Sequence, residues 1–182
     1  MTKKISFFVL IIFAGVFFTS CASAPSKPDW VMQGSGAFKK KKKKTFYGVG
    51  IAEGISSEAL RRTTADNRAI AEISKQLSVM STSLMRDYMS SATATEEEKS
   101  KGEQYVENTS KTFSSNMMSG VKIIDRWEGK NETMYSLAEL NLDDLVNMSD
   151  KVNQLSQAVR DHIKANAEKA FDKLNEEEQK RK

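Results

Sequence analysis

The sequence predicts an α+β fold, in which a small antiparallel or mixed sheet is packed by helices and a long C-terminal helix follows. One strand-like segment near the start is rich in aromatic and β-branched residues. Two stretches after it repeat apolar residues at spacings of three and four, which is the period of an amphipathic helix. A hairpin-like segment of alternating polarity and a further helical stretch come next, so the helices are expected on one face of the sheet.

The first residues have the pattern of an export signal. Lys3 and Lys4 precede an uncharged apolar run from Ile5 to Phe18, and two small residues then lead to Cys21, the only cysteine in the chain. The run is too short and wrongly flanked for a retained membrane span. It resembles the lipobox of bacterial lipoproteins, which implies a signal peptide over residues 1–20 and an acylated Cys21. The alternative is a secreted protein with a free thiol, which an oxidising compartment disfavours.

The residues after this cysteine are typical of a tether. Residues 21–28 are small or polar and include both prolines of the chain, which favours a flexible link between a lipid and a fold. Ala22 and Ser23 supply no acidic residue of the kind that retains lipoproteins at an inner membrane. We therefore expect a lipid-anchored protein of the cell outer membrane, whose partner at this end is membrane lipid bound through acylated Cys21.

The net charge of +4 comes from local lysines and not from a basic surface. Without Lys3, Lys4 and the run from Lys39 to Lys44, the balance is −4. Nucleic-acid binding is disfavoured, because it normally needs basic residues spread over a face. Like charges in a row repel one another, so the run is expected to be a solvated loop. The alternative is a site for anionic surfaces, formed by Lys39, Lys40, Lys41, Lys42, Lys43 and Lys44.

The first strand is expected from Thr45 to Ala52, with close backbone approach at Gly48 and Gly50. A nucleotide-binding interpretation of this glycine pair is disfavoured, because no third glycine stands at the fingerprint spacing. Upstream, Trp30 begins the apolar character of the mature chain. We expect it to dock on the core, and the alternative is an anchor in the membrane interface.

A long helix should begin at a cap formed by Ser56 or Ser57, with Glu58 in its first turn. Asn67 falls on the expected apolar stripe, where it would form a buried hydrogen bond to the adjacent strand or the floor of a polar pocket. Spacings of three and four place the following residues on that stripe: Leu60, Thr63, Asn67, Ile70, Ile73, Leu77, Met80, Leu84 and Tyr88.

A second helix should begin at the capping box formed by Thr95 and Glu98 and end near Gly120. Alternation then predicts a strand, Val121–Trp127, whose odd-numbered residues share one face. After a turn at residues 129–131, the segment Thr133–Asn141 is expected to return as its antiparallel partner.

The final helix is expected to start at Asp143 and Asp144 and to run without a break from Leu145 to Leu174. Its length of about 45 Å exceeds the roughly 30 to 35 Å of a compact domain of this size, so one end should overhang. We expect the overhang to carry a face for self-association or partner docking, formed by Ala167, Ala170, Phe171 and Leu174. The alternative is a solitary, frayed tail rich in Glu and Lys.

Short motifs shared with a known family occur at Pro28–Val31, Phe46–Ala52, Ala65–Glu72, Asp125–Trp127 and Tyr135–Leu140. Together they resemble the Lpp-twenty family of bacterial outer-membrane lipoproteins, to which the flagellar lipoprotein P group belongs. The resemblance implies an Lpp-twenty-like domain over residues 29–142, with residues 143–182 as a separate helix and charged tail. It also implies a non-enzymatic envelope lipoprotein, and some relatives build oligomeric rings around envelope machines.

Signals for catalysis, metals and cofactors are weak in this chain. Its one histidine, His162, has no partner pattern and is expected at the boundary of a packed helix face. Acidic clusters at Asp143–Asp144 and Glu96–Glu98 lie at helix starts, where the helix dipole explains them. No catalytic residue, metal site or cofactor is therefore expected.

Two hypotheses about function follow. The first is a structural or assembly lipoprotein that forms a homo-oligomer or binds an envelope protein partner. The second is a periplasmic module that binds cell-wall polymer or a protein through the lysine loop and the strand end at Gly48 and Gly50.

Overall fold

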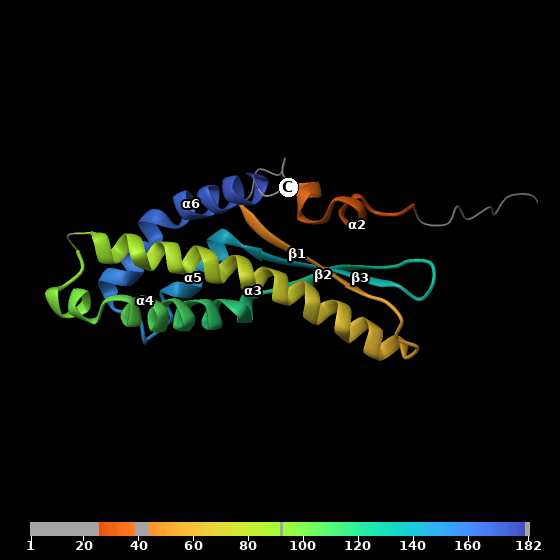
Figure 1. Ribbon diagram of the computed structural model, residues 1–182, viewed down its shortest axis with the longest axis horizontal. Helices are drawn as coiled ribbons and strands as arrows, with labels where there is room; N and C mark the ends of the chain where they lie inside the picture. The colour runs from red at the N-terminus through yellow and green to blue at the C-terminus, as the bar shows by residue number, and fades with distance from the viewer. Residues whose placement is uncertain (1–25, 39–43, 92, 181–182) are drawn as a thin grey trace, which may run out of the picture.

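The computed structural model describes residues 26–38, 44–91 and 93–180, and Figure 1 shows their arrangement. The α+β prediction is confirmed. In chain order the elements are α2 (Asp29–Gln33), η1 (Gly34–Phe38), β1 (Thr45–Ala52), α3 (Glu58–Ser90), α4 (Glu96–Met117), η2 (Met118–Gly120), β2 (Lys122–Glu128), β3 (Met134–Asn141), α5 (Leu142–Ser149) and α6 (Gln157–Lys180).

The described part of the chain forms one three-stranded antiparallel sheet in the order β1-β3-β2. We call its two sides the helix face and the outer face. The helix face is covered mainly by α3. Its residues Phe46, Ala138 and Leu140 belong to the main hydrophobic core, and Ala52 and Met134 form a smaller cluster with Ala65 of α3. The outer face is partly covered by α2 and η1, where Trp30 packs with Tyr47 and Leu137. Trp30 is 6% exposed, so the expected docking of this residue on the core is confirmed.

Small residues on both sides bring α3 close to β1. A Cβ added at Gly48 would overlap the carbonyl oxygen of Ala69, and one added at Gly50 would overlap that of Ala65. The close backbone approach predicted for the glycine pair is confirmed. These glycines accommodate a helix backbone, so the second hypothesis loses the part of its binding site at this strand end.

The close packing of α3 on β1 also means that the residues buried in the first half of α3 differ from those predicted. Ser57 caps the helix as expected, but Leu60 is 57% exposed and Asn67 is also exposed, so the prediction for the first half of the stripe is wrong. Only small side chains fit against the glycines of β1, and the helix therefore turns Ala65 and Ala69 toward the sheet. From Ile73 to Tyr88 the predicted apolar residues are buried.

The predicted single face of β2 is interrupted by a register irregularity. Ile123 pairs with Ala138 and Asp125 pairs with Leu137, which leaves Ile124 as an extra residue in the strand. An inserted residue reverses the side on which the following side chains point. Ile123 consequently packs on the main core, whereas Trp127 lies on the outer face. The expectation that Ile123, Asp125 and Trp127 share one face is wrong for this reason.

The capping box of α4 is confirmed, because the Thr95 hydroxyl accepts from the Glu98 amide while the Glu98 carboxylate accepts from the Thr95 amide. Gly102 breaks the helix with a φ of 51°. The buried side of α4, which includes Val106, Phe113 and Met117, faces the main core.

A long C-terminal helix is present as α6, but the prediction of one continuous helix from Leu145 to Leu174 is wrong. The chain leaves helical geometry between α5 and α6, at residues 150–156. This break lets α6 fold back along α3, as Figure 1 shows. The residues expected on an overhanging face are instead buried in the main core, namely Ala167, Ala170, Phe171 and Leu174.

Candidate functional site

Most of the predicted site residues lie outside the described part of the chain, including Cys21 and Lys39–Lys43. Lys44 is described, and its Nζ lies 2.8 Å from Asp172 Oδ2 and 3.2 Å from Glu168 Oε2 on α6. The hydrogen bond to Asp172 raises the pKa of Lys44. The last lysine of the run is thus fixed at the junction of β1 and α6.

The outer face of the sheet is built around Trp30. Its indole Nε1 donates to Asp125 Oδ2 at 2.9 Å, so α2 is joined to β2 by a specific hydrogen bond. Phe38 stacks on Tyr47 with ring centroids 4.0 Å apart. These contacts cover the part of the outer face near the start of β1, and they place the entry of the chain, at Lys27 and Pro28, beside this face.

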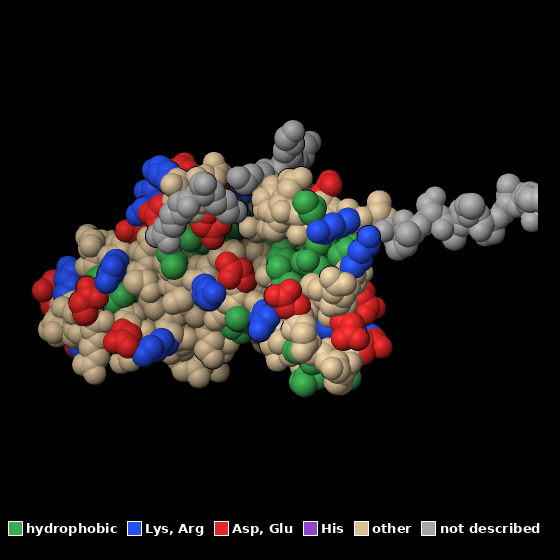
Figure 2. Space-filling view, turned by 45° about the vertical axis from the view of Figure 1, so that its right-hand side comes forward, with side chains coloured by type: hydrophobic (Ala, Val, Ile, Leu, Met, Phe, Trp, Pro, Cys, Tyr) green, Lys and Arg blue, Asp and Glu red, His purple; other side chains and the backbone are tan. Residues whose placement is uncertain are grey.

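A row of apolar side chains crosses the outer face next to this covered part. Ile51, Tyr135 and Trp127 are neighbours in the register of the three strands, and we call them the outer row. Ile51 is 42% exposed, and the other two are partly buried. Lys27 Nζ lies 5.7 Å from the ring centroids of both Trp127 and Tyr135. Figure 2 shows hydrophobic side chains gathered at the end of the molecule that carries α2.

The helix face contains a polar cluster around Asp66. Its carboxylate accepts hydrogen bonds from Arg126 Nε and Nη2 and, at 2.7 Å, from the hydroxyl of Ser136. Burial by itself raises the pKa of Asp66, but the hydrogen bonds from Arg126 and Ser136 outweigh it, and the net shift is downward. The polar contact sought at Asn67 is therefore made by its neighbour, and it joins α3 to β2 and β3.

Arg61 makes a second charged contact, which joins the start of α3 to the hairpin formed by β2 and β3. Arg61 is only 4% exposed; its Nη1 donates to the Ile55 carbonyl at 2.7 Å, and its Nη2 lies 3.0 Å from Glu128 Oε1. Arg61 is not among the residues that apolar spacing places on the buried stripe of α3, because it is charged. These contacts stabilise the fold and leave the arginine little freedom to bind a ligand.

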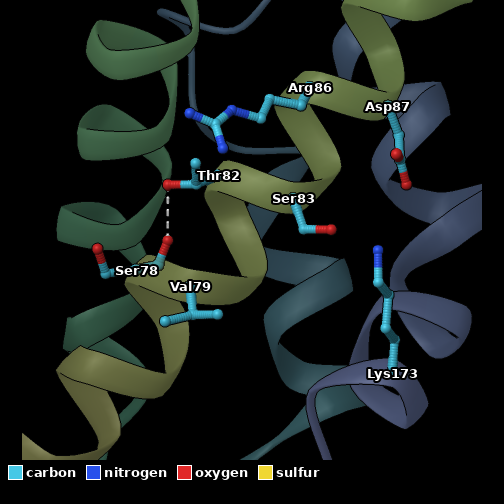
Figure 3. A pocket seen from close by; sticks show the side chains of 7 residues that line it. All are labelled: Ser78, Val79, Thr82, Ser83, Arg86, Asp87 and Lys173. Carbon is cyan, nitrogen blue, oxygen red and sulfur yellow. Dashed lines mark hydrogen bonds between the residues drawn. The ribbon is translucent and has the colours of Figure 1, made fainter. Parts of the chain in front are cut away.

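Two of the open grooves in the described part of the chain lie on the helical layer. Figure 3 shows the one between α3 and α6, where Lys173 and Asp87 approach each other from the two helices and Arg86 points to another side. The other lies between α3 and α4, where the hydroxyls of Ser81 and Ser114 are 2.8 Å apart. It is lined by hydroxyl-bearing side chains from both helices, including Ser74, Ser78, Thr82, Ser110, Ser114 and Ser115. Such a surface offers hydrogen bonds to a polar ligand but does not enclose one.

His162 takes part in helix packing. Its ring lies edge-on to Tyr88, with centroids 5.5 Å apart, where α6 meets α3. Burial lowers the pKa of His162, and the charge of Asp87 and the Leu84 carbonyl offset part of this shift. The expected boundary position is confirmed, because this residue is intermediate in exposure.

The described residues hold neither a cluster of metal ligands nor a helix that could span a membrane. Within them, no three His, Cys, Asp or Glu side chains are grouped closely enough to share a metal ion. Over the same ranges, no helix combines the length and the apolar composition that crossing a membrane requires.

A family model matches more than half of the chain. Residues 28–141 match the model of a family described as LPP20 lipoprotein. The match begins at the entry of the chain into α2 and ends at the last residue of β3, so it covers the whole sheet together with α3 and α4. No curated protein matches the chain.

Proposed function

The chain belongs to the LPP20 lipoprotein family, and from this premise we propose that it is a non-enzymatic outer-membrane lipoprotein with a structural or assembly role in the cell envelope. Membership in a lipoprotein family supports association with the envelope. The leader that ends at Cys21 supports a lipid anchor at that residue. Membrane lipid is then one partner, and a second copy of the chain is the other.

The observation that carries the assembly role is the exposed edge of the sheet at β2. In the order β1-β3-β2, no other described strand pairs with the outer edge of β2. Five of the seven residues of β2 are exposed, and Ile124 is 43% exposed at the irregular position. Edge strands present unpaired backbone groups that pair readily with another chain. A two-fold symmetric pair of β2 edges would extend the sheet across two protomers.

The test is the mass of the lipid-free protein, produced from residue 22 onward and measured by light scattering. We expect a dimer or larger oligomer that Ile124→Lys converts to a monomer, because the lysine places a charge in the interface. Val79→Lys is the matched control, since Val79 is 47% exposed on α3, away from β2. A monomer at every concentration tested would contradict assembly through this edge.

A second candidate function is a binding module for cell-wall polymer or an envelope protein. The observation that favours it is the hydroxyl-lined groove between α3 and α4. In that case the lipid-free protein would remain a monomer and change mass only when the ligand is added. Ser78→Leu and Ser115→Leu would then abolish binding without changing the fold.

A further inference from the structure

We propose that the outer row, formed by Ile51, Tyr135 and Trp127, is a membrane-contact surface that rests on the headgroup region of the bilayer. The inference rests on the proposed lipid anchor at Cys21. It adds an orientation, because it states which face of the domain lies against the lipid.

The first argument is the composition of the row. Tyr135 and Trp127 are directly paired in register, with ring centroids 5.5 Å apart, and Ile51 is the partner of Tyr135 on the other strand. Tyr and Trp are enriched at membrane–water interfaces, because one end of each side chain is apolar and the other is polar. A lysine beside such rings buries its stem and extends its charge toward the headgroups, and Lys27 stands at this position.

The second argument is the incomplete cover of the outer face. Trp30 and Phe38 cover Tyr47 and Leu137, but the next row is left at the margin of this cluster. The ring of Trp127 is held in place by close packing on Gly129, where an added Cβ would lie 2.7 Å from Trp127 Cζ3. A rigid, partly exposed aromatic surface needs no reorganisation to bind an apolar layer.

The third argument is reach. Each residue of extended chain spans at most about 3.6 Å, so the six residues from Cys21 to Lys27 span at most about 22 Å. Lys27 Nζ reaches the rings of the outer row, so the row lies no farther from the anchor than this span plus the length of the Lys27 side chain and its contact. The connection between α3 and α4 lies at the opposite end of the molecule (Figure 1), beyond the 33 residues of α3, which are about 50 Å long. The tether therefore keeps the outer row, and not the far end of α3, close to the anchor.

The experiment uses intrinsic fluorescence, because the chain contains only two tryptophans, Trp30 and Trp127. The lipidated protein is purified from membranes and reconstituted into phosphatidylethanolamine–phosphatidylglycerol vesicles, with or without bromine on the lipid chains near the headgroups. Bromine quenches tryptophan at contact. We expect a loss of emission in the wild type that is absent in Trp127→Phe, whose remaining signal comes from the buried Trp30.

The control is Val79→Trp in the Trp127→Phe background, which places a reporter on exposed α3 outside the outer row. Its emission should be unaffected by brominated lipid. If wild-type Trp127 is not quenched although the protein floats with the vesicles, the membrane-contact surface is refuted and the anchor stands. If the Cys21-bearing protein does not float with the vesicles, the anchor itself is refuted, and the orientation with it.

Discussion

Asp66 and Arg126 form a two-pronged ion pair, with Arg126 Nε and Nη2 at 2.9 and 2.8 Å from the two carboxylate oxygens. The pair joins the first half of α3 to β2, the edge strand proposed to take part in assembly. The Asp66 side chain is 18% exposed and the Arg126 side chain 42% exposed, so the pair lies at the boundary of the core. Two parallel charge-assisted hydrogen bonds fix orientation as well as distance.

We predict that Asp66→Ala lowers the free energy of unfolding by about 1–3 kcal/mol, because Arg126 and the buried Ser136 each lose a partner. Arg126→Lys should cost less, since it keeps the charge and loses only the two-pronged geometry. Urea denaturation measures both. Asn67→Ala, at the exposed neighbouring position, is the control and should stay within about 0.5 kcal/mol of wild type. Equal effects at Asp66 and Asn67 would contradict the structural role of the pair.

Gly50 is predicted to tolerate no side chain. A Cβ there would overlap the carbonyl oxygen of Ala65 and approach the Ala69 amide, and neither backbone atom can move aside without displacing α3. Gly50→Ala should therefore destabilise the protein by at least about 1–3 kcal/mol, as overpacking does. The control is Ile51→Val, which removes one methyl group from a side chain 42% exposed on the other face. Thermal melting of the two variants side by side decides the prediction, which fails if Gly50→Ala melts with the wild type.

Local signals in the sequence predicted most elements, because strands, caps and turns depend on neighbouring residues. The bounds of β1 are those expected from its aromatic and β-branched residues, and Thr95 and Glu98 form the expected capping box. The side of α3 that faces the sheet could not be found in this way. Apolar spacing favoured Leu60 as buried, whereas the glycines of β1 select small residues such as Ala65. The two glycines of β1 indicate which side of α3 packs against the sheet, but only once it is known that α3 packs on β1.

Sites that join distant segments were the least predictable. The Trp30–Asp125 hydrogen bond depends on the extra residue at Ile124, which turns Asp125 to the outer face. Alternation along β2 gives no indication of such an irregularity, and it placed Asp125 on the same side as Ile123. The outer row was missed for the same reason. The break between α5 and α6 was also hidden, because Val152 and Leu155 keep the helical rhythm and are buried although they lie in a connection.

Stability is predicted to fall as the pH is lowered from about 7 to 5, through His162. Its pKa is lowered below the ordinary value of 6.5 by burial, so the unfolded chain takes up the proton first. The contribution of His162 to stability is complete above its pKa in the unfolded chain. It is lost as the pH falls toward its pKa in the folded protein. The lowered pKa values of Asp66 and Glu98 act in the same direction, but at more acidic pH. His162→Gln should flatten the curve of unfolding free energy between pH 7 and 5, and an unchanged slope would assign the loss to other groups.

The last prediction concerns α6, which up to Leu174 is a component of the core and not a free tail. Phe171 is 7% exposed and meets Phe46 of β1 edge-on, with ring centroids 4.8 Å apart. Phe171→Ala should therefore lower the free energy of unfolding by about 3–5 kcal/mol, the usual cost of emptying a buried aromatic position. Lys169→Ala, two residues away on the exposed side of the same helix, should have little effect. Both variants are compared by urea denaturation, and the mass of folded Phe171→Ala is measured by light scattering. If Phe171→Ala keeps its stability but loses an oligomer, α6 is an assembly surface after all and the packing described for it does not hold in solution.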